Sequence, residues 1–208
     1  MIPRYQKIIL GLLLVASLGM GIKLWQLRDR AHKNLLAGET TTPTEAPEVA
    51  PAEQATLIAA NDLDNSLVPQ MHSLPLPADP GARARAVLGK LLDLYAAPDS
   101  THPVPGGAAS VAQVFLMPVP DTKATQASEN QLAVVNLTGT FAASHPSGLE
   151  TESLTVLSIC ATIRANLPNV TEVRFLVDGQ QRPSLAGHAD LTRTYLTADA
   201  TPTEGSRP

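Results

Sequence analysis

The residues that could do chemistry are few and widely spaced. The chain has five histidines, at positions 32, 72, 102, 145 and 188, and a single cysteine, Cys160. No two histidines have the HExxH spacing that places two imidazoles on one helix face for a zinc ion. The sequence also lacks a GxSxG elbow, which would present a nucleophilic serine. It therefore predicts no catalytic residue, no metal site and no cofactor.

Two further features have simpler explanations than chemistry. Cys160 falls among apolar residues of a predicted helix, where a cysteine usually acts as a small buried hydrophobic side chain. Because it is alone, it cannot form an internal disulfide or a cysteine-based zinc site. Pro105-Gly106-Gly107 lacks the Lys-Ser/Thr that completes a phosphate-binding loop, so it predicts a plain turn.

The strongest candidate for a binding or interaction loop lies near the C-terminus. It comprises Asp178, Gly179, Gly187, His188 and Asp190. One interpretation is a pocket built around His188 and Asp190. The alternative is that the two glycines form turns while His188 or Asp190 caps backbone donors, as short polar side chains commonly do.

The elements expected to position this loop are a helix and a strand. Ser147 and Glu150 have the spacing of a capping box and predict a helix that ends before Pro168. Alternating apolar residues over 170–177 predict a strand. The Asp178-Gly179 dipeptide that follows favours a sharp hairpin turn. A last short strand is possible near residues 191–196.

The first half of the domain also has clear signals for the starts and ends of strands and helices. Residues 55–60 and 67–76 predict two strands, the second of them edge-like because of its prolines. Asp79-Pro80 then opens a helix, with Asp79 as N-cap. Residues 111–119 and 132–137 are almost continuously apolar, which favours the interior of a sheet. The expected order is β-β-α-β-β-α-β: an α/β (α+β) fold with a mixed sheet of about five strands and two helices on one face.

The flanking segments differ in composition from this domain. Residues 35–53 are rich in Thr, Pro and Glu and predict a disordered linker, and residues 198–208 predict a disordered tail. A length of 208 residues leaves room for one ordinary domain, over residues 54–197. The net charge of −4 argues against nucleic acid as a partner, because binding phosphates requires clustered Lys and Arg.

An apolar segment near the N-terminus predicts a single membrane span. Residues 8–22 are all apolar or small, Arg4 and Lys7 precede them, and Trp25 suits the membrane interface. Extended over residues 2–27, the helix is long enough for a bilayer core of about 30 Å. An uncleaved signal anchor is preferred to a cleaved signal peptide, which needs a better cleavage site, and to a buried soluble helix. The anchor, within residues 1–34, would include Ile8, Leu14, Ile22 and Trp25.

Several stretches together resemble the GerMN domain of sporulation and germination proteins. They are LAVVNLTGTF, SGLETESLTVLSICATIRANLPNV, EVRFLVDGQ and LAGHADL, and the similarity extends over about residues 55–197. The resemblance implies an extracytoplasmic bacterial domain held by a lipid or membrane anchor, similar in fold to ring-building modules and without enzymatic activity. Asn136 stands where the family strand usually carries Asp, and the anchor lacks a lipidation cysteine. The resemblance does not imply that this chain takes part in sporulation.

These features lead to an expected function. The chain would be a non-enzymatic, membrane-anchored interaction or assembly module of the bacterial cell envelope, whose partner is an envelope protein or a second copy. The alternative is a module that binds cell-wall material or a small molecule. Orientation is an open conflict: the resemblance implies a periplasmic domain, whereas the cations after the span (Lys23, Arg28, Arg30 and Lys33) favour a cytoplasmic one.

Overall fold

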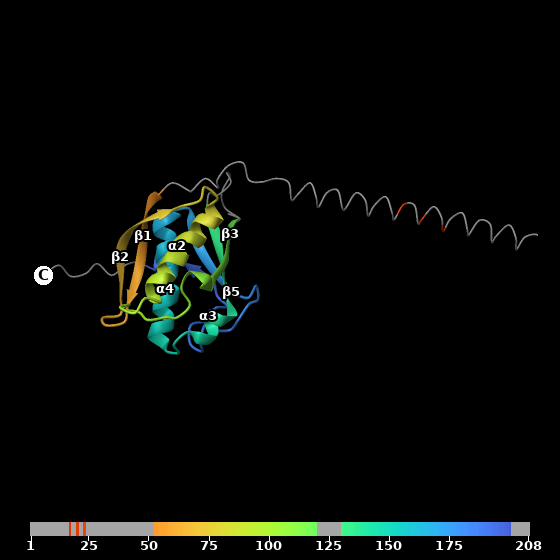
Figure 1. Ribbon diagram of the computed structural model, residues 1–208. Helices are drawn as coiled ribbons and strands as arrows, with labels where there is room; N and C mark the ends of the chain where they lie inside the picture. Colours follow the sequence, from red (N-terminus) through yellow and green to blue (C-terminus); the bar gives the residue numbers. More distant parts are fainter. Residues whose placement is uncertain (1–16, 18–19, 21–22, 24–51, 120–129, 201–208) are drawn as a thin grey trace, which may run out of the picture. The chain divides into compact units, whose positions relative to one another are not determined.

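Figure 1 shows a computed structural model of the chain, which describes residues 17, 20, 23, 52–119 and 130–200. The chain divides into two compact units, Met1–Glu48 and Val49–Pro208. In the first unit Ser17, Met20 and Lys23 are helical and exposed. The predicted anchor residues Ile8, Leu14, Ile22 and Trp25 lie outside the described residues, as does the predicted linker up to residue 51. Within the described ranges, no helix is both long and apolar enough to cross a bilayer.

The second unit begins with a hairpin of two long strands. β1 (Ala52–Asn61) pairs antiparallel with β2 (Ser66–Pro75), as the sequence predicts. The turn between them ends at Asn65, whose φ of 53° is a conformation that Asn tolerates better than most residues. β2 contains Pro69 and Pro75, which have no N–H to donate. The outer side of the hairpin is therefore a poor template for a further strand.

Helix α2 (Pro80–Tyr95) follows and confirms the predicted start signal. The carboxylate of Asp79 accepts a hydrogen bond of 2.7 Å from Ala82 N, and Pro80 occupies the first helical position. Apolar side chains recur at helical spacing and form one buried face: Val87, Leu88, Leu91, Leu92 and Tyr95.

The remaining strands form a separate four-stranded sheet. After a short 3-10 turn (Gly107–Ser110) come β3 (Val111–Pro118), β4 (Gln131–Leu137), β5 (Val170–Val177) and β6 (Tyr195–Leu196), in that order across the sheet. β4 and β5 are parallel and the other pairs are antiparallel. Two helices connect the parallel pair: α3 (Gly139–Ser144), which the sequence analysis missed, and α4 (Leu149–Asn166).

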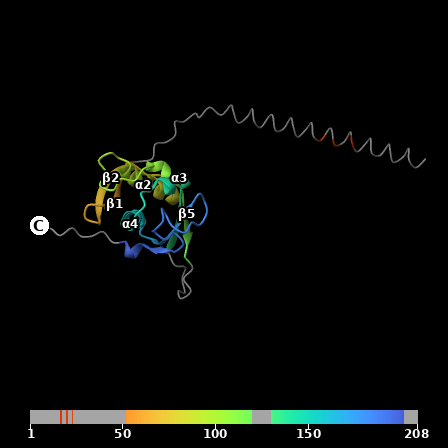
Figure 2. The ribbon, with the colours of Figure 1, turned by 90° about the horizontal axis from the view of Figure 1, so that it is seen from below.

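The prediction of one mixed sheet is wrong in one respect, because β1 and β2 form a separate sheet, whereas the mixed sheet of β3, β4, β5 and β6 has both long helices on one face. α2 and α4 lie between the hairpin and the four-stranded sheet, as Figures 1 and 2 show from two directions. Helix side chains take the place of a neighbouring strand along β1. Thr162 Oγ1 accepts a hydrogen bond from Ile58 N (2.9 Å), Asn166 Oδ1 from Thr56 N (3.1 Å), and Tyr95 Oη from Ala60 N (2.9 Å). Because these backbone donors are already satisfied, β1 needs no further strand.

The predicted capping box at the start of α4 is also wrong. The N-cap is Gly148, with φ 168°, and no side chain at that position makes a capping bond. Leu149, the first residue of α4, is 65% exposed. From Glu152 to Ile163, however, α4 is buried on almost every side, including three hydroxyl residues: Thr155, Ser158 and Thr162. A helix between two sheets has no broad solvent face, so a one-sided apolar pattern could not describe it.

The C-terminal end of the described chain packs on this core. Thr197–Asp199 forms a 3-10 turn. Thr197 donates a hydrogen bond of 3.0 Å from Oγ1 to Val170 O, and Ala200 is buried. Three residues of the predicted tail, 198–200, therefore belong to the structured part.

Candidate functional site

The Asp178-Gly179 pair forms the sharp turn that the sequence predicts. Both residues have positive φ, 50° and 74°, and Val177 and Gln180 exchange backbone hydrogen bonds of 2.9 and 3.0 Å. This is the geometry of a two-residue hairpin turn. The Asp178 carboxylate accepts a bond of 2.8 Å from Gly139 N, and Gly179 N donates one of 2.8 Å to Asn136 Oδ1. Both turn residues are thus engaged in joining the ends of β4 and β5 to the start of α3.

The second part of the predicted loop wraps around a carboxylate that the sequence analysis did not single out. Glu152 in the first turn of α4 has no exposed side-chain surface. Its Oε2 accepts hydrogen bonds from the backbone N–H groups of Ala186, His188 and Ala189 at 2.9–3.0 Å. Its Oε1 accepts one from Gly148 N at 3.2 Å and lies 2.9 Å from His188 Nδ1.

These contacts fix the charge of Glu152. Burial alone would raise the pKa of the carboxyl group, but the N–H groups of Ala186 and Ala189, together with those of His188, lower it to about 2. The carboxylate is therefore ionised at neutral pH and holds the 186–189 segment against α4. No local pattern reveals this role, because the donors of Ala186, His188 and Ala189 come more than thirty positions later.

His188 and Asp190 have different surroundings. The His188 side chain is 46% exposed and directs Nδ1 to Glu152. The Asp190 carboxylate accepts hydrogen bonds from Oγ1 (2.6 Å) and N (2.8 Å) of Thr192, which lower its pKa, so Asp190 caps a turn. Gly187, with φ 128°, lies in a backbone region that few other residues adopt.

A cavity of about 270 Å³ adjoins His188. Its apolar side consists of Leu149, Val156 and Leu157, and its polar rim includes Asp190 and Arg193. The Arg193 guanidinium carbon lies 4.2 Å from the centroid of the Tyr195 ring. No carboxylate of the described residues forms an ion pair with Arg193.

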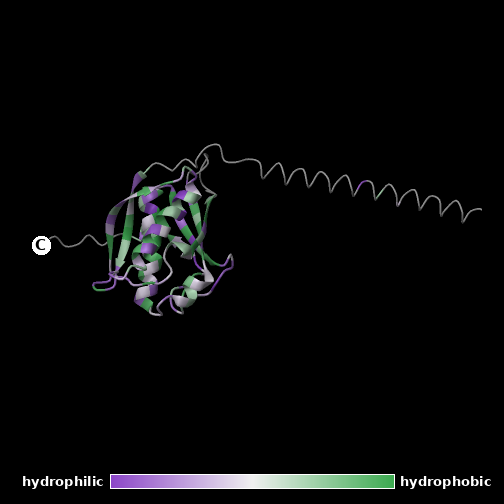
Figure 3. Ribbon diagram, in the orientation of Figure 1, coloured by the Kyte–Doolittle hydropathy of each residue, from purple (hydrophilic) through white to green (hydrophobic). Residues whose placement is uncertain are grey.

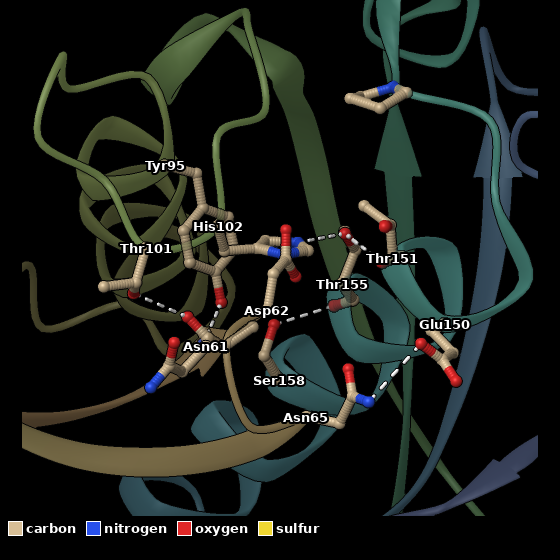
Figure 4. A network of polar contacts seen from close by, with 12 residues as sticks. Asn61, Asp62, Asn65, Tyr95, Thr101, His102, Glu150, Thr151, Thr155 and Ser158 are labelled. Carbon is tan, nitrogen blue, oxygen red and sulfur yellow. Dashed lines mark hydrogen bonds and ion pairs between the residues drawn. The ribbon is translucent and has the colours of Figure 1, made fainter.

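A buried histidine network lies further along α4 and was also missed from the sequence (Figure 4). His102 is fully buried; its Nδ1 lies 2.5 Å from Asp62 Oδ1 and its Nε2 lies 2.7 Å from Thr155 Oγ1. On the other side of Thr155, His145 Nε2 lies 2.8 Å from the same hydroxyl oxygen, and His145 Nδ1 lies 2.8 Å from Pro146 O. These residues come from the β1–β2 turn, two loops and α4, so no sequence motif unites them.

The hydrogen bonds around Thr155 outnumber the protons that can form them. Thr155 has one hydroxyl proton but faces two imidazole nitrogens and the carbonyl of Thr151 at 3.1 Å. Both Nδ1 atoms face oxygen acceptors, so with two neutral rings the single hydroxyl proton serves three contacts, and two of these contacts lack a proton. Burial lowers the pKa of the His145 imidazole, so this ring is neutral at pH 7.

Cys160 lies at the centre of the core. Its side chain is fully buried, and burial raises the pKa of the thiol to about 12. The thiol is therefore protonated at neutral pH and packs as a small apolar group, as the sequence indicates.

The four-stranded sheet has one face against the helices and one face that no described element covers. Cross-strand partners place two rows of side chains on this outer sheet face. One row is Met117, Leu132, Glu172 and Leu196; the next is Phe115, Val134 and Arg174. Phe115, Met117 and Leu196 are 49%, 47% and 51% exposed. Figure 3 shows the hydrophobic colour of these strands.

The outer sheet face corrects one sequence interpretation. The apolar runs at 111–119 and 132–137 predict strands in the interior of a sheet. β4 lies between β3 and β5, as predicted, but among the described strands β3 is an edge strand that pairs with β4 alone. Its inward residues Val111 and Val114 are buried, whereas Phe115 and Met117 face outwards. Apolar residues therefore occupy both faces although the helices cover only one.

The geometry defines a class of protein: an α+β domain whose buried polar groups stabilise loops and whose four-stranded sheet has an apolar face that no described element covers. The chain belongs to the sporulation and spore germination family, Germane, whose model matches residues 58–183. This match confirms the resemblance to the GerMN domain.

Solved structures with a similar chain path include the tandem GerMN domains of the sporulation protein GerM from Bacillus subtilis. That structure is 17% identical over 71% of this chain and 47% of its own, with a TM-score of 0.42, so this chain spans about half of its length. A putative lipoprotein from Clostridium perfringens is 21% identical over 75% of this chain and 95% of its own, with a TM-score of 0.35. No curated protein sequence matches this chain.

Proposed function

We propose that this chain is a non-enzymatic, membrane-anchored interaction module of the bacterial cell envelope, and that it binds a protein partner through the outer sheet face. The observation that carries the proposal is the exposure of Phe115 and Met117 beside the half-buried Leu132 and Val134. A sheet face of this composition is usually covered by another protein layer, because isolated soluble domains rarely expose contiguous apolar patches.

The burial and the hydrogen-bond partners of the titratable side chains support a non-enzymatic role. Glu152 is enclosed by five donors, and His102 and Thr155 have no exposed surface through which a substrate could reach them. The Asp62–His102–Thr155 series has the order of a catalytic triad, but its hydroxyl lies inside the protein between two imidazoles. A nucleophile in that position could not attack a substrate from solvent.

The anchor and the orientation are part of the same proposal. The apolar segment 8–22 would span the membrane once, and family membership favours a domain outside the cytoplasm. A C-terminal fusion to a phosphatase that is active only outside the cytoplasm tests this orientation. Activity is expected; activity of a cytoplasmic reporter at the same position would show that the cations after the span determine the topology.

Site-specific photo-crosslinking in cells tests the interaction surface. A photoreactive amino acid at Phe115 should capture a defined protein partner, whereas the same group at Met71 should not. Met71 is a suitable control because it is 72% exposed but lies on the hairpin. Equal capture from both positions, or none from Phe115, would contradict the proposal.

The cavity beside His188 favours a second candidate function, the binding of a cell-wall fragment or another small molecule. It combines an apolar side with the guanidinium group of Arg193, which forms no ion pair with a described carboxylate; ligand sites often have this composition. The purified full chain can be titrated with soluble muropeptides, with Arg193→Ala as the matched variant. Saturable binding that is lost in the variant would favour this function over the first.

A further inference from the structure

We propose that the partner of the outer sheet face is a second copy of this chain, packed face to face about a two-fold axis. The inference rests on the proposed function and names its partner. Two opposite charges lie within the apolar face. Glu172 and Arg174 lie two residues apart on β5 and point to the same side. Neither forms an ion pair with any other described residue.

The two rows of side chains on the outer sheet face complement each other. A two-fold axis in the plane of the interface, perpendicular to the strands and level with Val173, lays each strand antiparallel over its own copy. Glu172 of one copy then faces Arg174 of the other, and the reverse holds on the other side of the axis. On the same basis Met117 faces Phe115 and Leu132 faces Val134. The cross-strand register supplies all of these positions.

This symmetry removes two unfavourable features of the outer sheet face together. Apolar side chains of β3 and β4 become covered by apolar side chains, and each half-buried charge gains an opposite charge. A partner of unrelated sequence would have to supply the same alternation of charge and apolar surface. A second copy contains it already, in the reverse order that the symmetry requires.

The test uses charge reversal in the purified full chain, solubilised in detergent micelles, with mass measured by sedimentation equilibrium. The wild type is expected to be a dimer. Glu172→Arg should place four cations together and Arg174→Glu four anions, so each variant alone should dimerise at least about tenfold more weakly. Mixing the two variants should restore a dimer, because each then faces its complement. The double exchange E172R/R174E should also dimerise.

The test includes one control variant, and three results would contradict the proposal. Asp99→Arg changes charge by the same amount as Glu172→Arg at an exposed loop position and should leave the dimer unchanged. A monomeric wild type, or single variants that dimerise as the wild type does, would overturn the inference. So would single variants whose dimerisation mixing does not restore. If photo-crosslinking from Phe115 still captures a different protein, the proposed function stands while self-association fails.

Discussion

Two buried polar side chains, Glu152 and Thr155, lie one turn apart on α4 and have opposite hydrogen-bonding surroundings. Glu152 is an anion with a surplus of donors: four backbone N–H groups and one imidazole. Thr155 is a neutral hydroxyl with a shortage of protons, since three acceptors compete for one. The comparison teaches that a buried charge held by backbone donors has a fixed protonation state, whereas a hydroxyl between imidazoles makes stability depend on pH.

The largest effect should come from removing the charge of Glu152. In Glu152→Gln the amide group would direct its own N–H donors at backbone donors, so a free-energy loss of about 3 kcal/mol or more is expected. Urea unfolding followed by circular dichroism measures it. Glu150→Gln, at an exposed position two residues earlier, should change stability by less than about 0.5 kcal/mol. Similar losses in both variants would mean that the loop around Glu152 contributes little.

Thr155→Val should cost less but still a substantial amount. The substitution keeps the side-chain shape and removes the only hydroxyl between His102 and His145, so about 1–3 kcal/mol should be lost. The exposed Thr140→Val is a matched control and should be nearly neutral. An unchanged stability in Thr155→Val would show that the two imidazoles find other partners, and the proton count would then be wrong.

The stability contributions of the Thr155 network and of Glu152 should depend on pH in different ranges. His145 has a lowered pKa, so below its ordinary value of 6.5 the unfolded chain binds more protons than the folded one. Its stabilising contribution is complete above pH 6.5 and declines as the pH falls, by at most about 1.4 kcal/mol per pH unit. Comparing wild type with His145→Gln between pH 7.5 and about 5 isolates this slope. A difference that does not change with pH would contradict the assignment.

Glu152 should respond only in stronger acid. Its pKa of about 2 lies below the ordinary 4.5, so its contribution is complete above pH 4.5 and declines as the pH falls towards 2.

The smallest effect is expected at His188. His188→Ala removes one of five donors from Glu152, but the four backbone N–H groups remain and the lost side chain was half-exposed. A loss of about 0.5–1 kcal/mol in urea unfolding would agree with this surplus. A loss as large as that of Glu152→Gln would show that the imidazole, not the backbone, holds the carboxylate.

Local signals in the sequence were sufficient for most of the elements. The Asp79-Pro80 start of α2 and the Asp178-Gly179 turn follow from the φ and ψ preferences of those residues, which act within one turn of chain. The hairpin strands and β5 follow from apolar patterning. The capping box at Ser147 was wrong because Gly148 N is satisfied by Glu152 instead, a choice that depends on the loop 186–189 packed over it.

What the sequence determined by itself is thus the order and approximate bounds of the strands and long helices, together with the family. Only the tertiary structure decided how they are layered. β1 is separated from the larger sheet because Thr162 and Asn166, more than one hundred residues away, satisfy its backbone N–H groups. The network around Thr155 and the outer sheet face on β3 and β4 likewise depend on contacts between residues that are distant in sequence. Hydrogen bonding and burial are decided by neighbours in space, and local preferences do not specify those neighbours.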